Sequence, residues 1–267
     1  MADQMSYRLE VEYDGSDFRG WQVQKAGRTV QGELEKALAR LFGEPTVAVA
    51  AGRTDAGVHA TGQVVHFHAV RSRPVEIVER ALNALLPEDI LIRKASLVSS
   101  DFHARFQACW RRYKYILTTQ PSALWRRFVW HPRFDYDFDR VKEATHDFLG
   151  RHDFSSFVLS GADSGSTVCQ VFGVDWEEKE TLRILDIVAD RFLRGMVRLI
   201  LGTLLEIGRG RFEPRSIPLI LEARHVGRAG PIAPPQGLTL VEVGYAPWEA
   251  TSEEVKTERN ALFCEGA

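Results

Sequence analysis

Ala51-Gly52-Arg53-Thr54-Asp55-Ala56-Gly57-Val58-His59-Ala60 is the most informative stretch of the sequence. Apolar residues precede it from Val47 and follow it at 64–67, a pattern typical of a loop that joins two strands. Glycine adopts backbone angles that other residues avoid, and small side chains leave room for a ligand. We therefore expect Asp55 on a tight loop, with Arg53 as its nearest charged partner.

Two interpretations of Asp55 are open at this point. An isolated Asp beside Gly most often caps its own turn, because both residues favour turns for local reasons. The ten-residue string as a whole, however, resembles the active-site motif of the type A tRNA pseudouridine synthases. The resemblance implies that Asp55 is the nucleophile. Further similar stretches run from about Tyr13 to Tyr245, so the resemblance covers nearly the whole chain.

The order of expected elements predicts an α+β protein. Alternating apolar residues in 7–13 indicate a strand, and Thr29 and Gly43 flank an amphipathic helix. The resemblance implies two similar domains, each a mixed, mainly antiparallel sheet with helices on one face, and a cleft between them. We place the N-terminal domain, which carries the Asp55 loop, at 1–103, the C-terminal domain at 104–248 and a polar tail at 249–267.

A second motif follows in the segment Cys109-Trp110-Arg111-Arg112-Tyr113-Lys114-Tyr115. On a strand, Arg111 and Tyr113 face one way and Arg112 faces the other. Basic groups interleaved with aromatic rings suit a polyanion with stackable bases, although charges also protect a solvated edge strand. The segment resembles the family's second motif, which implies that Tyr113 lies against the target base.

A third motif is a predicted helix over 191–207. Arg191, Arg194 and Arg198 would line one face of it, near an N-terminus whose dipole disfavours cations. This placement indicates facing anions, and ordinary surface charge is the alternative. The segment 194–198 resembles the family's arginine motif, which implies that Arg198 pairs with the catalytic Asp. Gly195 departs from that motif, because the family often has a histidine or another polar residue there.

The net charge of the chain does not favour a nucleic-acid ligand, whereas local clusters of basic residues do. The net charge of −2 argues mildly against such a ligand, but phosphate contacts act within a Debye length of about 8–10 Å, so clustering matters more than the sum. The residues that we expect to hold RNA phosphates are Arg105, Arg111, Arg112, Arg126, Arg191 and Arg194.

Composition limits the cofactors and the location. His66 and His68 share one strand face, but no third ligand is spaced nearby, so we expect no metal. The resemblance implies no cofactor and a homodimer. Three scattered cysteines form no disulfide framework, the longest apolar run is broken by Arg198, and the first residues do not form a signal peptide. We expect a cytoplasmic protein without a membrane span.

The residues and the resemblance together give a functional hypothesis. The chain isomerises uridine to pseudouridine in the anticodon stem-loop of tRNA, at about positions 38 to 40, as the resemblance implies. Asp55 must be ionised, and Arg53 or Arg198 would keep it so. Two other classes stay open. A glycosidase would also use an Asp but usually needs a second carboxylate as its acid, and a non-catalytic RNA-binding module would leave Asp55 idle.

Overall fold

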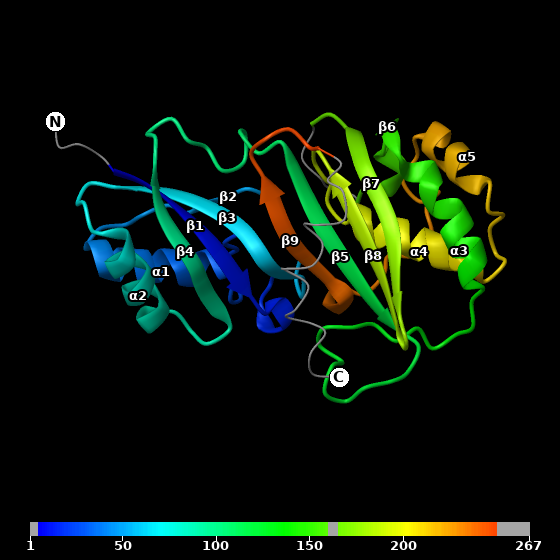
Figure 1. The fold of residues 1–267 in the computed structure, drawn as a ribbon, viewed down its shortest axis with the longest axis horizontal. Helices are drawn as coiled ribbons and strands as arrows, with labels where there is room; N and C mark the ends of the chain where they lie inside the picture. The colour runs from blue at the N-terminus through cyan, green and yellow to red at the C-terminus, as the bar shows by residue number, and fades with distance from the viewer. Residues whose placement is uncertain (1–4, 160–164, 250–267) are drawn as a thin grey trace.

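The computed structural model describes residues 5–159 and 165–249, and in these the strands form one sheet (Figure 1). The strand order is β4-β1-β3-β9-β5-β8-β7-β6, with β2 paired to β3. All pairs are antiparallel except β3 with β9. The strands are β1 Met5–Tyr13, β2 Val49–Ala50, β3 His59–Ala69, β4 Ile90–Val98, β5 Trp110–Thr118, β6 Gly150–Asp153, β7 Val168–Lys179, β8 Leu182–Ala189 and β9 Leu238–Gly244.

The helices form two groups on one face of this sheet. α1 and α2 lie against the half that contains β1 and β4, and the others lie against the half that contains β7 and β8 (Figure 1). Their bounds are α1 Val30–Phe42, α2 Val75–Leu85, α3 Phe138–Thr145, α4 Met196–Gly208 and α5 Ser216–Ala223, with short 3₁₀ turns η1 Gly15–Asp17, η2 His146–Phe148, η3 Ser155–Phe157 and η4 Pro235–Gly237. This architecture confirms the predicted α+β class with a mainly antiparallel sheet.

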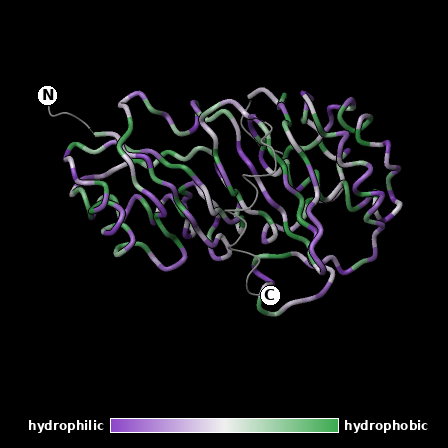
Figure 2. The backbone as a smooth tube through the Cα atoms, viewed as in Figure 1, coloured by the Kyte–Doolittle hydropathy of each residue, from purple (hydrophilic) through white to green (hydrophobic). Residues whose placement is uncertain are grey.

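Alternation in β1 explains which face the helices cover. Tyr7, Leu9, Val11 and Tyr13 are fully buried, and Tyr7 meets Phe42 of α1 with ring centroids 5.8 Å apart. Charged side chains such as Arg8 and Glu10 occupy the other face, and the hydropathy colour changes along the chain in Figure 2. The predicted helix limits are confirmed, because the Thr29 hydroxyl accepts from Gly32 N and Gly43 is left-handed at φ +79°.

The last strand joins the two halves of the chain. β9 lies between β3 and β5, and its parallel pairing places His59 beside Thr239 and Ala60 beside Leu240. The sheet is therefore continuous across the predicted boundary at 103. The division into two domains with a cleft between them stays a prediction. Most of the predicted tail, 250–267, lies outside the described residues.

The predicted helix over 191–207 begins later than expected. Its first helical residue is Met196, because Gly195 adopts a left-handed conformation at φ +73° and residues before it are irregular. Arg191 and Arg194 therefore lie ahead of the helix, and the expectation that they share a helical face with Arg198 is wrong. Gly195 instead serves as the residue where the chain turns into α4.

Helix α4 is buried on all sides and packs directly on the loop before β9. Every residue in it is buried except Arg198, which is half-buried. A Cβ on Gly202 would lie 1.6 Å from the carbonyl oxygen of Pro231, which shows how closely the two backbones approach. Among the described helices none, α4 included, combines the length and apolarity that a membrane span requires.

We expect Gly202→Ala to destabilise the fold by about 3 kcal/mol, because overpacking against fixed backbone outweighs the gain of about 1 kcal/mol in helix propensity. Chemical denaturation measures the free energy of unfolding. Gly173→Ala is the matched control, because Gly173 lies in β7 with no atom within 4 Å of the added methyl group. Equal stabilities for the two variants would contradict the packing described here.

Candidate active site

Asp55 begins a four-residue turn that presents its carboxylate to solvent. Val58 N donates to Asp55 O at 3.2 Å, and Gly57 supplies the left-handed residue of the turn at φ +77°. The Asp55 side chain is 24% exposed, so a substrate can reach it. Within the described part of the chain its carboxylate bonds to Arg198 and not to its own turn, which argues against the simple capping interpretation.

The partner of Asp55 is Arg198, in the first turn of α4. Arg198 Nη1 donates to Asp55 Oδ2 at 3.0 Å, and the Arg198 side chain is only 13% exposed. Its Nε donates to Ala233 O at 2.8 Å, while Ala233 N donates to Arg198 O at 3.1 Å. The guanidinium is thus fixed from two sides. Arg53, which we expected as the nearest partner, has an exposed side chain, and its role beside Asp55 stays a prediction.

The N-terminal end of the Asp55 turn is held by buried groups. Trp21 N donates to Thr54 O at 3.0 Å, and the Tyr13 and Thr54 hydroxyls lie 2.7 Å apart. Burial raises the pKa of Tyr13 to about 12, so this phenol stays protonated as a hydrogen-bond partner. Gly20 approaches so closely that a Cβ there would lie 2.7 Å from Thr54 O. The residue before Asp55 is therefore fixed by two separate segments, β1 at Tyr13 and the loop at 20–21.

Tyr113 lies near Asp55 on the helix-covered face of β5. Its side chain is 8% exposed, and its ring packs edge-on against Phe192 with centroids 5.0 Å apart. Burial, followed by the neighbouring Tyr13 and Asp55, raises the pKa of Tyr113 well above its usual value. The phenol is therefore neutral here, and the phenolate that would accept a proton is disfavoured.

Arg111 is turned into the protein. It is 8% exposed, and its two Nη atoms donate at 2.7–3.0 Å to the carbonyl oxygens of Ala51, Arg105, Ala108 and Asp190. This geometry ties β5 to the start of the Asp55 loop and does not place the guanidinium where a phosphate can reach it. Arg112, on the opposite face of the sheet, forms a two-point ion pair with Asp186.

The remaining predicted phosphate-binding residues differ in exposure. Arg105, Arg126 and Arg194 are exposed, and Arg191 is half-buried. The histidine pair His66 and His68 lies on the opposite sheet face from Tyr7, with His66 buried. Within the part of the chain that the structure describes, no group of three or more metal-ligating side chains is close enough to hold an ion.

Two sets of contacts in the site were not predicted from the sequence. One is made by the His59 ring with three separate segments, and the other is made by the stiff 231–237 loop with Arg198. His59 stands four residues after Asp55 in the same motif, and the loop contains Pro231, Pro234 and Pro235. Proline fixes backbone angles, which was the available signal that this loop is stiff.

Comparison with known proteins identifies the family. A family model described as tRNA pseudouridine synthase matches residues 10–107 and 144–246. The chain belongs to the tRNA pseudouridine synthase family. It is 45% identical over 242 residues to tRNA pseudouridine synthase A of Moorella thermoacetica, covering 89% of this chain and 98% of the relative. It is 42% identical over 240 residues to the enzyme of the same name from Acetivibrio thermocellus, with the same shares covered.

We expect Arg111→Met to cost about 3–5 kcal/mol of unfolding free energy, because it leaves four carbonyl oxygens without their buried cationic donor. Arg112→Met is the matched control on the next position of β5. It should cost about 1 kcal/mol, since the Arg112–Asp186 pair is partly solvated. Denaturant titrations of both variants make the comparison. A smaller loss for Arg111→Met than for Arg112→Met would show that the carbonyl contacts do not support the site.

Proposed function

We propose that Asp55 is the nucleophile with which this chain converts uridine to pseudouridine in tRNA. Membership of the family makes the chain an isomerase of this kind. One observation supports this role for Asp55. Its carboxylate is reachable from solvent and lies 3.0 Å from a guanidinium that comes from the other half of the sequence. A turn residue with only a local role needs no such partner.

The reaction breaks the bond between ribose C1′ and uracil N1, turns the base and joins C1′ to C5. The C5 proton is lost and N1 gains one, so no group and no electron leaves the nucleotide. Asp55 supplies the electron pair that forms the temporary bond, either to the ribose carbon or to the uracil ring. Arg198 offsets the charge of the carboxylate before attack and holds its direction.

Tyr113 lies against the target base in this proposal. Its ring is packed on one edge by Phe192 and lies close to Asp55, which fits a group that limits how far the detached uracil can move. Because the phenol is neutral, it positions the base or donates a hydrogen bond in the form described here. It accepts the C5 proton only if substrate binding changes its ionisation.

The proposal also covers the surface that binds the rest of the tRNA and the oligomeric state of the protein. A stacked uridine must leave the stem at a cost of a few kcal/mol before Asp55 can reach it. The exposed guanidiniums of Arg105, Arg126 and Arg194, with half-buried Arg191 and exposed Arg53, would bind phosphates of the anticodon stem-loop around positions 38 to 40. A homodimer would extend this surface for a large polyanion, and a protein that acts on tRNA would work in the cytoplasm.

We expect Asp55→Asn to abolish pseudouridine formation while tRNA binding stays within about threefold of the wild type, because the amide cannot form the temporary bond. Release of tritium from [5-³H]uridine-labelled tRNA measures turnover, and filter binding measures affinity. Free uracil in the wild-type reaction would instead indicate a glycosidase. Binding without turnover by the wild type would indicate a binding module.

Tyr113→Phe separates packing from hydroxyl chemistry, because it keeps the ring. We expect it to bind tRNA as the wild type does and to slow turnover by about 10²-fold if the hydroxyl takes part in proton transfer. Single-turnover tritium release at saturating enzyme gives the rate. Full activity in this variant would restrict Tyr113 to a packing role.

A further inference from the structure

His59 is a buried imidazole that connects three segments at the C-terminal end of the Asp55 turn. It is 3% exposed and begins β3. Its Nε2 lies 2.8 Å from Arg127 O and 3.2 Å from Gln236 O. Its Nδ1 lies 3.1 Å from Gly15 N and 3.2 Å from Asp14 Oδ1. One ring therefore joins η1 in the N-terminal half to two loops of the C-terminal half.

These contacts define the protonation state of the ring. Gly15 N is a donor, so Nδ1 must carry the lone pair, and Nε2 carries the proton that it donates to the two carbonyl oxygens. Burial lowers the pKa of His59, and the Asp14 carboxylate only partly opposes this effect. The neutral Nε2–H form is thus the one that the surroundings select near pH 7.

The loop that His59 contacts also forms hydrogen bonds with Arg198, the partner of Asp55. Residues 233–236 accept from Arg198 Nε at Ala233 and from His59 at Gln236. The same loop packs on the turn itself, because a Cβ on Gly57 would lie 2.8 Å from a side-chain carbon of Pro235. The Tyr115 hydroxyl also holds this loop, because it donates to Pro234 O at 2.7 Å. Asp55 and Arg198 are therefore held through a single short, proline-containing segment.

We propose that His59, in its Nε2–H form, is a positioning residue that holds the Asp55 turn on the 233–236 loop and thereby sets the Asp55–Arg198 geometry. This inference depends on the proposed function of Asp55. Thr54 fixes the turn at its N-terminal end, and His59 fixes it at the other, so loss of the His59 contacts frees only one end. A misplacement of the nucleophile by about 1 Å can cost about 10²-fold in rate, which sets the scale of the effect.

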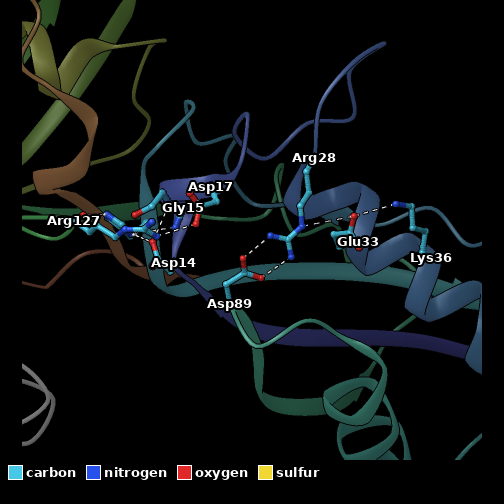
Figure 3. Close-up of polar contacts among 10 residues, drawn as sticks. Asp14, Gly15, Asp17, Arg28, Glu33, Lys36, Asp89 and Arg127 are labelled. Carbon is cyan, nitrogen blue, oxygen red and sulfur yellow. Dashed lines mark hydrogen bonds and ion pairs between the residues drawn. The ribbon is translucent and has the colours of Figure 1, made fainter.

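Protonation of His59 breaks this arrangement in a defined way. A proton on Nδ1 would face the Gly15 N–H donor and be drawn to Asp14 Oδ1, which would move the ring and with it the Nε2 contacts to the two loops. A glutamine at this position places no donor against Gly15 N. The other charged groups at this point are Asp17 and Arg127, which pair with each other at 2.8 Å (Figure 3). Arg28 pairs with Asp89 (Figure 3). The backbone oxygen of Asp89 accepts from Asp14 N at 3.1 Å. Because burial lowers the folded pKa below its ordinary value of about 6.5, the neutral ring persists below that pH and is lost only under more acidic conditions.

Two substitutions divide the roles of the two ring nitrogens. His59→Gln extends a donor toward Arg127 O and Gln236 O but lacks Nδ1, whereas His59→Asn offers an acceptor to Gly15 N but cannot reach the two loops. We expect His59→Asn to lower kcat about 10–100-fold with KM for tRNA within about threefold, and His59→Gln to keep kcat within about threefold. His68→Gln, on the same strand, is the control and should match the wild type.

The pH profile gives a readout that loss of stability alone would not change. Wild-type single-turnover rates should fall on the acid side of the ordinary histidine pKa of about 6.5, and His59→Gln should lack this decline. Thermal unfolding checks that each variant is folded, and the His59→Gln profile decides the question if His59→Asn does not fold. Wild-type kcat in His59→Asn, or the same acid decline in His59→Gln, would overturn the inference. An inactive wild type would overturn the proposed function instead.

Discussion

The ion pair between Asp55 and Arg198 depends on two parts of the chain that are 143 residues apart. A carboxylate on an exposed loop gains little from a mobile cation, because solvent screens the pair and flexible side chains lose entropy when they meet. In this protein, other contacts hold both side chains in the positions that the ion pair requires. Arg198 is held by Ala233 through its side chain and its backbone, and Asp55 sits in a turn fixed at both ends.

The sheet topology brings these groups together. The last strand, β9, inserts between β3 and β5, so the chain must return from the far side of the C-terminal half to the centre of the sheet. The loop that makes this return, 231–237, passes α4 at Gly202, Arg198 at Ala233 and the Asp55 turn at Pro235. Fixing the position of β9 therefore also fixes the distance between the Asp55 carboxylate and the Arg198 guanidinium.

The face of the sheet decides which basic residues can bind a polyanion. Arg111 and Arg112 are adjacent in sequence, yet one satisfies four buried carbonyl groups and the other pairs with Asp186 on the opposite face. Alternation predicted that their side chains point in opposite directions, but not which direction is buried. The exposed arginines lie in loops, where local pattern gives no position in space, so the composition of the proposed RNA-binding surface was the least predictable part of the site.

The sequence by itself determined the elements with strong local signals: the alternation in β1, the caps of α1 at Thr29 and Gly43, and the turn at Gly57 that exposes Asp55. It also indicated Asp55 and Arg198, through their resemblance to family motifs. Tertiary structure decided that Arg198 from the other half of the chain pairs with Asp55, that α4 starts after Gly195, and that His59 bridges both halves. Propensity and periodicity act over a few residues, whereas these contacts depend on how β9 closes the sheet across the whole length of the chain.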